Sequence, residues 1–342
     1  MRIGILTGGG DCPGLNPVIR AVVRKALVDK HEIIGIKNGW KGLVENDTIV
    51  LNLDNTSGIL NRGGTILGTS RTNPYKKEGD VQKVKDNFKQ LKLDALIAVG
   101  GEDTLGVANK LLKEGLNVVG VPKTIDNDLN ETEYTFGFDT AVNIAMEAID
   151  RLHTTADSHH RVLVVEIMGR HAGWIALHAG IAGGADAVLI PETPIDLNQV
   201  CQIIKKRCAR GKLFSIIAVS EGAQLKEGDI VLQKKELDAF GHVRLGGIGE
   251  TLAKKIEEAT KHETRSVVLG HLQRGGCPTA FDRVLGTRFG VKAVELVNEK
   301  KFGYMVSLKA NKIVPVAIDK AVAKLKTIDD KEWLYLIKTI CV

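Results

Sequence analysis

Short apolar runs of strand length recur along the chain, each followed by glycine and then by a segment of helical periodicity. Apolar residues at helical spacing predict the helices between these runs. Continuous apolar strands that alternate with helices are typical of parallel sheets covered by helices on both faces. The predicted strands lie within 2–9, 31–39, 93–101, 116–123, 161–169, 186–192, 213–222 and 266–276, and the predicted helices span 17–27, 81–90, 104–113, 138–157 and 248–259.

At 342 residues the chain is too long for one ordinary core and fits two domains of about 150 residues each. The predicted fold class is therefore α/β with mainly parallel sheets. The stretch 223–264 departs from this pattern because it is polar, with short alternating pieces. It predicts an inserted hairpin ahead of the helix at 248–259.

The charge and composition of the chain limit the classes of molecule that it is expected to bind. The formal net charge is +6, and the dense Lys/Arg run at 205–212 has apolar residues at helical spacing, which favours a solvated helix face over a nucleic-acid surface. Aromatic residues are only 4% of the chain and offer few stacking platforms. No stretch reaches the roughly 18 apolar residues of a membrane span. We expect neither nucleic acid nor membrane as a partner; a mild positive balance suits small anions such as sugar phosphates.

The N-terminus and the cysteines predict a cytoplasmic protein. "MRIGILTGGG" at 1–10 is typical of a strand that enters a glycine turn, and its apolar run is too short for a signal peptide. The cysteines form no CxxC pair, and an odd, scattered set in a long chain predicts reduced thiols rather than a metal site. The five are Cys12, Cys201, Cys208, Cys277 and Cys341.

Glycine-rich turns follow two of the predicted strands, where open parallel sheets bind their ligands. In "TGGGDCPGLN" at 7–16, three glycines let backbone N–H groups approach phosphate oxygens, and a helix follows whose positive end faces the site. A plain strand–helix turn is the competing interpretation. "GGEDTLG" at 100–106 has the same character but carries two carboxylates, Glu102 and Asp103, where an anion would bind.

"PKTIDND" at 122–128 is the strongest chemical pattern. If the stretch is extended, the carboxylates of Asp126 and Asp128 face the same side. One can accept a proton from a substrate hydroxyl while the other holds a metal or orients its partner. Lys123 supplies positive charge for phosphate oxygens. The alternative is an Asx-rich turn that caps the next segment.

Arginine and histidine follow two later strands, in "EIMGRHAGW" at 166–174 and "GHLQRGG" at 270–276. Arg170, His271 and Arg274 can clamp a phosphomonoester, because a guanidinium matches phosphate geometry. Glu221 in "SEG" offers an acceptor for sugar hydroxyls. Together the strand ends predict phosphoryl transfer to a sugar phosphate.

These motifs resemble the phosphofructokinase family, whose members phosphorylate fructose 6-phosphate at its 1-hydroxyl. "LTGGGDCPGLN", "NRGGTILGTSR", "GGEDT", "PKTIDND", "MGR", "SEG" and "GHLQRGG" occur in the family's order across nearly the whole chain. The resemblance implies two Rossmann-like domains with the active site in the cleft between them. It assigns 1–137 and 273–323 to a phosphoryl-donor domain for pyrophosphate and Mg²⁺. It assigns 138–272 and 324–342 to a fructose 6-phosphate domain, with an inserted segment near 223–247.

Position by position, the resemblance implies that Asp126 is the catalytic base, flanked by Thr124 and by Asp128, which helps to place the base and the metal. It implies that Arg170 steadies the transferring phosphoryl group. The implied sugar-phosphate residues are Thr124, Asp126, Arg161, Met168, Gly169, Arg170, Glu221, Arg265, His271 and Arg274. The implied donor residues are Gly10, Arg71, Asp103 and Lys123, with Glu102 for Mg²⁺. Arg161 and Arg265 resemble arginines that reach a neighbouring subunit's site, which implies a homodimer or homotetramer.

The donor follows from Asp103 and Lys123, a pair that resembles the pyrophosphate-dependent branch of the family. Members that use ATP generally have glycine in place of Asp103 and often in place of Lys123. A carboxylate at Asp103 would fill the space of the α-phosphate and repel its charge. The implied reaction is a reversible, Mg²⁺-dependent step of glycolysis that gives fructose 1,6-bisphosphate and phosphate. The alternatives are an ATP-dependent 6-phosphofructokinase and, more remotely, a non-catalytic regulatory subunit; sedoheptulose 7-phosphate remains open as a second acceptor.

Overall fold

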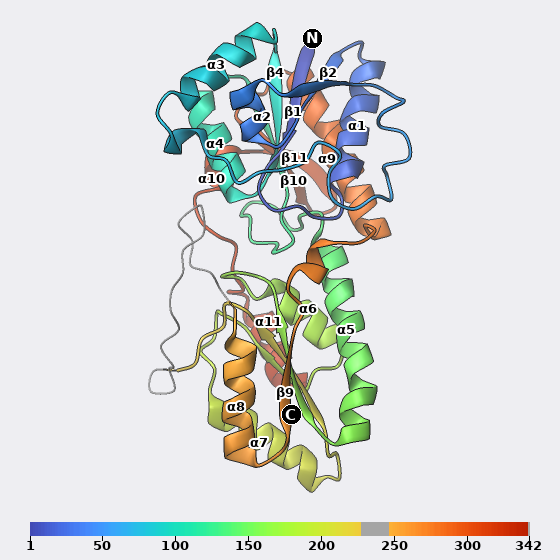
Figure 1. The fold of residues 1–342 in the computed structure, drawn as a ribbon, viewed down its shortest axis with the longest axis vertical. Helices are drawn as coiled ribbons and strands as arrows, with labels where there is room; N and C mark the ends of the chain where they lie inside the picture. The colour runs from blue at the N-terminus through green and yellow to red at the C-terminus, as the bar shows by residue number, and fades with distance from the viewer. Residues whose placement is uncertain (227–245, 341–342) are drawn as a thin grey trace. The chain divides into compact units, whose positions relative to one another are not determined.

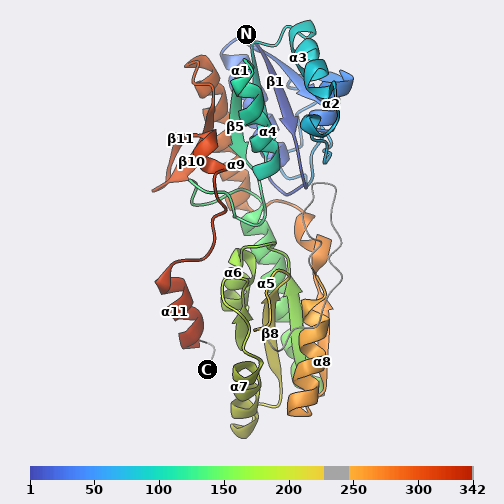
Figure 2. The same cartoon turned by 90° about the vertical axis from the view of Figure 1, so that its left-hand side faces the viewer.

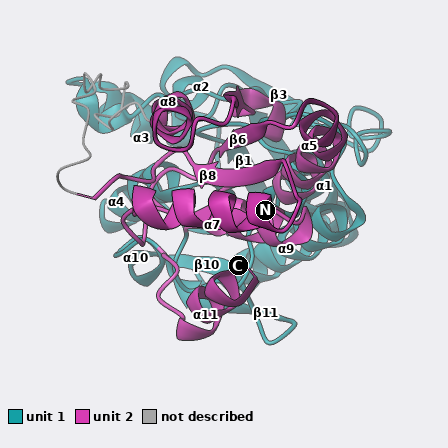
Figure 3. Cartoon of the chain, turned by 90° about the horizontal axis from the view of Figure 1, so that it is seen from below, with its two compact units in different colours: residues 1–125, 129–140, 274–325 teal, residues 126–128, 141–273, 326–342 magenta. Residues whose placement is uncertain are grey.

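The structure is a computed structural model of the chain that describes residues 1–226 and 246–340 (Figure 1). The insertion predicted near 223–247 falls mostly on residues 227–245, which lie outside the described residues. The chain divides into two compact units (Figure 3). Unit 1 comprises residues 1–125, 129–140 and 274–325, and unit 2 comprises residues 126–128, 141–273 and 326–342.

Unit 1 is built on a seven-stranded sheet in the order β11-β10-β5-β4-β1-β2-β3. Its central strands pair in parallel, while β3 and β11 close the two edges in antiparallel pairings. The strands are β1 (Arg2–Thr7), β2 (Glu32–Ile36), β3 (Thr48–Leu51), β4 (Ala95–Gly100), β5 (Val118–Pro122), β10 (Tyr304–Lys309) and β11 (Lys312–Ala317).

Helices cover both faces of this sheet, because successive strand residues point to opposite sides. Leu6 of β1 packs with Trp40, Val84 and Leu111 in the core beneath α2, α3 and α4. Helices α1 and α9 pack against each other on the other side (Figure 1). The bounds are α1 (Leu15–Val28), α2 (Trp40–Glu45), α3 (Asp80–Gln90), α4 (Glu102–Lys113), α9 (Ala280–Asn298) and α10 (Ile318–Ala321), with a short 3₁₀ turn at Pro74–Lys76.

Unit 2 is built on a four-stranded parallel sheet in the order β7-β8-β6-β9. Helices α7 and α8 bury one face through residues such as Ile204 and Ile256. Helix α6 covers the other, where Gly180 comes close to Val188 and Ala218. The elements are α5 (Phe138–His159), β6 (Val162–Ile167), α6 (Trp174–Ala182), β7 (Ala187–Leu189), α7 (Leu197–Ala209), β8 (Ser215–Ser220), α8 (Ile248–Thr260), β9 (Thr264–Val268), a 3₁₀ turn (Gly270–Arg274) and α11 (Lys331–Ile340), which contacts α6 (Figure 2).

The strand order of unit 1 places a topological switch between β1 and β4. From β1 the chain continues to β2 on one side, whereas β4 and β5 lie on the other side. Open α/β sheets bind ligands at such a switch, beyond the carboxyl ends of the strands. The two glycine-rich turns, 8–14 and 100–103, follow the two strands that flank it.

The predicted fold class is confirmed: the sheets are mainly parallel and helices flank them. The eight predicted strands and five predicted helices are present, most with small shifts at their ends, but β9 ends at Val268 and residues 270–274 of the predicted stretch 266–276 form a 3₁₀ turn. The shift that matters most for the site is at α4, which begins at Glu102 rather than at Thr104, so that Glu102 and Asp103 are part of the helix. The sequence did not predict β3, β10 and β11. Within the described part of the chain, no helix is long and apolar enough to cross a membrane.

Candidate active site

The glycine-rich turn after β1 is held by two cationic side chains within unit 1. The Lys123 Nζ donates to the Gly10 carbonyl at 2.5 Å, and Lys123 is buried. The Arg274 Nη1 donates to the Asp11 carbonyl at 3.4 Å. A Cβ on Gly10 would lie 2.6 Å from the same Arg274 nitrogen, so a larger residue there would displace the end of the Arg274 side chain. Two of the predicted cations therefore lie against the turn that was predicted to cradle phosphate.

Arg274 was assigned to the sugar phosphate, and the structure places it in unit 1 against Gly10 and Asp11. The two residues before Arg71 also contact this turn. The Thr69 Oγ1 donates to the Gly9 carbonyl at 2.6 Å, and the Gly9 N–H donates to the Ser70 carbonyl at 3.3 Å. Arg71 itself is exposed.

The turn after β4 is shaped by Thr104, a buried residue in the first turn of α4. A Cβ on Gly8 would lie 2.6 Å from the Thr104 Oγ1, and one on Gly100 would overlap the Thr104 side chain. The backbone of the two turns can approach because both positions are glycine. Thr104 was not among the predicted site residues, although it is the last residue of "GGEDT".

Glu102 and Asp103 lie in the first helical turn of α4, after Gly101 at the N-cap. Glu102 is exposed and Asp103 is half-buried. The first turn of a helix carries a partial positive charge, which stabilises carboxylates there by roughly 0.3–1 kcal/mol. The helix start therefore tolerates the two negative charges that looked misplaced in the sequence.

In unit 2, the predicted base Asp126 is buried, with 5% of its surface exposed, and Asp128 is half-buried. Asn127 between them has a left-handed backbone with φ of 52°. The expectation of an extended stretch with both carboxylates on one face is therefore wrong at this residue. The Lys326 N–H donates to the Asp128 carbonyl at 2.8 Å and anchors the segment.

The loop from Met168 to Gly173 after β6 carries the predicted phosphoryl-steadying residue, Arg170. The Glu221 Oε1 accepts from the N–H groups of Gly169 and Arg170 at 3.3 and 3.1 Å. A Cβ on Gly222 would overlap the Arg170 carbonyl, so the glycine of "SEG" lets the loop pack on the end of β8.

Glu221 is close enough to the predicted base for their charges to interact. Burial raises the pKa of the Glu221 carboxyl above its ordinary value. The Asp126 carboxylate raises this pKa further, while the two backbone N–H groups lower it. Asp126, Arg170 and Glu221 therefore belong to one neighbourhood of unit 2.

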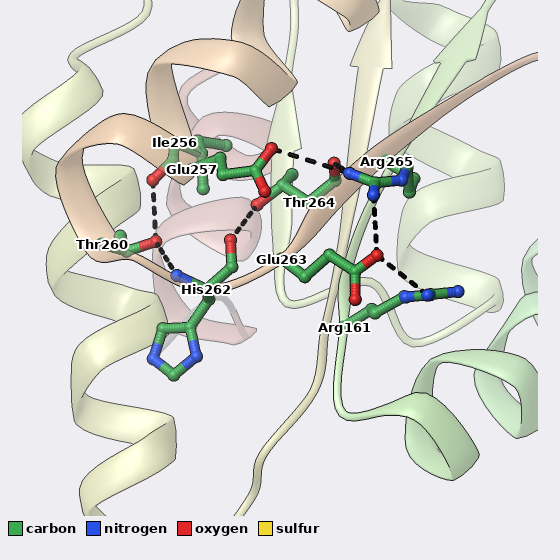
Figure 4. Close-up of polar contacts among 8 residues, drawn as sticks. All are labelled: Arg161, Ile256, Glu257, Thr260, His262, Glu263, Thr264 and Arg265. Atoms are coloured by element: carbon green, nitrogen blue, oxygen red, sulfur yellow. Dashed lines mark hydrogen bonds and ion pairs between the residues drawn. The ribbon is translucent and has the colours of Figure 1, made fainter.

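Arg161 and Arg265 lie elsewhere in unit 2 and share one carboxylate (Figure 4). Their guanidinium nitrogens lie 2.8 and 2.7 Å from the Glu263 Oε1. Arg161 precedes β6 and Arg265 is the second residue of β9, so both lie at the amino-terminal edge of the parallel sheet. Met168 follows the carboxyl end of β6, about 20 Å away along the strand. These two arginines are not brought to the neighbourhood of Asp126 and Glu221 in their own chain.

His271 is exposed on the 3₁₀ turn at Gly270–Arg274. The four cysteines within the described residues carry free thiols, as predicted. Burial raises the pKa of the Cys12 thiol to about 12. Cys12 therefore stays protonated near neutral pH and is a poor nucleophile.

The residues of unit 1 suit a magnesium ion that is bound together with a phosphate ligand. The described residues contain no group of three or more His, Cys, Asp or Glu side chains placed to hold a metal. Mg²⁺ commonly keeps several waters and binds through one or two carboxylates plus substrate phosphates. The exposed Glu102, beside a phosphate-type turn, fits that mode.

Comparison with known proteins decides the family. The family described as Phosphofructokinase matches residues 2–297 of this chain. The chain belongs to the phosphofructokinase family.

Two relatives from Streptomyces coelicolor differ in the donor that their names state. The chain is 58% identical to the pyrophosphate–fructose 6-phosphate 1-phosphotransferase, over 96% of this chain and 96% of that protein. It is 52% identical to the ATP-dependent 6-phosphofructokinase 3, over 97% of this chain and 98% of that protein. The solved phosphofructokinase from Saccharomyces cerevisiae is 31% identical, with a TM-score of 0.83 over 99% of this chain and 46% of the yeast chain.

Proposed function

We propose that this phosphofructokinase transfers a phosphoryl group from pyrophosphate to the 1-hydroxyl of fructose 6-phosphate. The oxygen of the hydroxyl bonds to phosphorus, the bridging P–O bond of pyrophosphate breaks, and fructose 1,6-bisphosphate and phosphate leave. The reaction is reversible, because pyrophosphate and the sugar phosphate ester are close in transfer energy.

One observation carries the choice of donor: Asp103 stands in the first turn of α4 while Lys123 lies buried against the turn after β1. The Asp103 carboxylate repels the third phosphate group that ATP would place near it, because both are negatively charged. Pyrophosphate ends before that position, and Lys123 balances the charge of the phosphate that leaves. The 58% identity to a relative named for pyrophosphate supports the same donor.

The other roles follow the two units. Unit 1 takes the donor through Gly10, Arg71 and Lys123, and the Arg274 guanidinium lies on the same turn. Unit 2 takes the sugar phosphate through Met168, Gly169, Glu221 and His271. Asp126, with Thr124 and Asp128 beside it, accepts the hydroxyl proton, and Arg170 neutralises charge on the phosphoryl group.

Mg²⁺ would be held by Glu102 together with the donor's own phosphate oxygens. When bound, the ion offsets negative charge that develops on the phosphate oxygens. In unit 2, Asp128 helps to place the metal and the base Asp126.

A coupled assay of the purified protein tests the donor. With fructose 6-phosphate and Mg²⁺, we expect turnover with pyrophosphate and a kcat/KM for ATP at least about 100-fold lower, since one repelled charge costs several kcal/mol. Chelation of Mg²⁺ should abolish turnover, and added Mg²⁺ should restore it. Robust turnover with ATP and none with pyrophosphate would instead favour the ATP-dependent alternative. The 52% identity to a relative named as an ATP-dependent 6-phosphofructokinase is the reason to test it.

We also propose that the active enzyme is an oligomer, in which Arg161 and Arg265 bind the sugar phosphate of a neighbouring subunit. The support is their position at the amino-terminal edge of the unit 2 sheet, remote from Met168 along the strand. Glu263 orients both guanidinium groups.

Mixing two inactive variants tests this sharing. Asp126→Asn and Arg161→Ala are each expected to lose most activity, and their co-expressed mixture to regain about a quarter of it. The reason is that half of randomly paired dimers then contain one site with both residues intact. A mixture no more active than the variants alone would show that each chain uses its own Arg161.

A further inference from the structure

The loop that carries Arg170 is held at both ends by carboxylates of unit 2. The Glu221 Oε1 accepts from the Arg170 N–H at 3.1 Å at one end, and the Glu192 Oε1 accepts from the Gly173 N–H at 3.0 Å at the other. Arg170 has a left-handed backbone with φ of 53°. A non-glycine residue keeps such a conformation only where its surroundings enforce it.

Glu192 also holds a second segment, from the C-terminal part of the chain. The same Oε1 accepts from the Ile328 N–H at 3.0 Å, and Ile328 is 2% exposed. One carboxylate oxygen therefore joins the Arg170 loop to the segment 326–328. Glu192 was not among the predicted site residues, although it is a carboxylate that comes soon after β7.

The other end of the segment 326–328 contacts the predicted base segment. The Lys326 N–H donates to the Asp128 carbonyl at 2.8 Å. The Trp174 Nε1, at the start of α6, donates to the Lys326 carbonyl at 2.9 Å. The three residues 326–328 thus bond to Asp128 at one end and, through Glu192, to the Arg170 loop at the other.

We propose that Glu192 is a positioning residue for phosphoryl transfer, which fixes the Arg170 loop relative to Asp126–Asp128 through the segment 326–328. The inference rests on the proposed function, in which Asp126 accepts the proton and Arg170 steadies the phosphoryl group. A displacement of about 1 Å in such a constellation can cost about 100-fold in rate. Loss of the Glu192 bonds therefore lowers the rate of the chemical step.

The bonding of Glu192 agrees with this role better than with a purely stabilising one. Its Oε2 is buried and has no hydrogen-bond partner among the described residues. Its Oε1 bonds both to the Arg170 loop and to the segment 326–328, which in turn bonds to Asp128.

Three variants of the full-length enzyme test the proposal. Glu192→Ala is expected to lower kcat by about 10- to 100-fold while KM for fructose 6-phosphate changes less than about threefold. Glu192→Gln keeps one carbonyl oxygen that can accept both N–H groups, so its kcat should stay within about threefold of wild type. Asp196→Ala is the matched control, because Asp196 also accepts from two backbone N–H groups, at the start of α7, and its bonds among the described residues lie outside this loop. It should lower the melting temperature without lowering kcat.

Hydrogen exchange of the same proteins gives a readout that does not depend on activity. In Glu192→Ala the amides of Gly173 and Ile328 should exchange faster than in wild type and in Asp196→Ala. If Glu192→Ala does not fold, Trp174→Phe, which removes only the indole N–H bond to Lys326, should lower kcat by at least about threefold.

The proposal is overturned if Glu192→Ala keeps wild-type kcat, if Glu192→Gln is as impaired as the alanine variant, or if Asp196→Ala loses as much kcat. Rates are measured with whichever donor the wild-type enzyme turns over. A failure of the pyrophosphate assignment is therefore distinguishable from a failure of the Glu192 role.

Discussion

Replacing Asp126 with asparagine is expected to lower kcat by about 1,000-fold, with KM values within about fivefold of wild type. Removal of a general base typically costs 10²- to 10⁴-fold, because the amide cannot accept the hydroxyl proton during the transfer. The substitution is isosteric, and Asp126 is 5% exposed, so the shape of the site should persist. Steady-state kinetics with fructose 6-phosphate at fixed donor concentration measures the effect.

Asp186→Asn is the control for this variant. Asp186 belongs to unit 2, accepts from the Ile216 N–H and lies 2.7 Å from the Arg207 guanidinium, away from the proposed chemistry. Its replacement should lower the melting temperature but leave kcat unchanged. If Asp126→Asn retains more than a tenth of wild-type kcat, Asp126 is not the base.

The Asp103→Gly variant is expected to raise kcat/KM for ATP by about 100-fold, equivalent to about 2.7 kcal/mol of transition-state free energy. The physical reason is the loss of a carboxylate that repels the additional phosphate of a nucleotide. Activity with pyrophosphate should fall at the same time, and Lys123→Gly added to Asp103→Gly should raise ATP use further. The ratio of kcat/KM for the two donors is the measurement.

Asp80→Gly is the matched control for Asp103→Gly. Asp80 stands in the first turn of α3 as Asp103 does in α4, and it pairs with Lys83. Both replacements lose a favourable helix–charge interaction and gain glycine's conformational cost, so both should lower stability. Only Asp103→Gly should change the donor ratio. If ATP use stays undetectable in both the single and the double variant, charge exclusion at Asp103 does not select the donor.

Apolar patterning predicted the parallel core but not the antiparallel edges of the unit 1 sheet. Four of the predicted strands, β4, β5, β6 and β8, are buried from end to end, and the apolar run of β4 is continuous. β10 and β11 form a hairpin whose two turn residues, Ala310 and Asn311, have φ of 45° and 60°. That turn usually carries glycine, so "KANK" gave no hairpin signal. Pro315 in β11 also argues against a strand, except at the sheet edge where β11 lies.

Most of the proposed site residues follow strand ends, and this is why they could be proposed from the sequence. Glycine, carboxylate and arginine after an apolar run predict a ligand site without any knowledge of side-chain contacts. What could not be predicted depends on contacts between distant segments. The bonds of Glu192 to Ile328 and of Arg274 to Asp11 join residues 136 and 263 positions apart. The left-handed backbone of Asn127 likewise has no reliable signature in one sequence.

The discontinuity of the two units constrains how the protein can be synthesised. The chain passes from one unit to the other five times, after residues 125, 128, 140, 273 and 325. The last piece of unit 1 supplies β10, which pairs with β5, and α9, which packs on α1. Until residue 309 has left the ribosome, the β5 edge and the exposed face of α1 remain uncovered in the nascent chain. Unit 1 therefore cannot finish folding until most of unit 2 has also been synthesised. A chain truncated before β10 would expose the edge of β5, and such an edge is prone to aggregation.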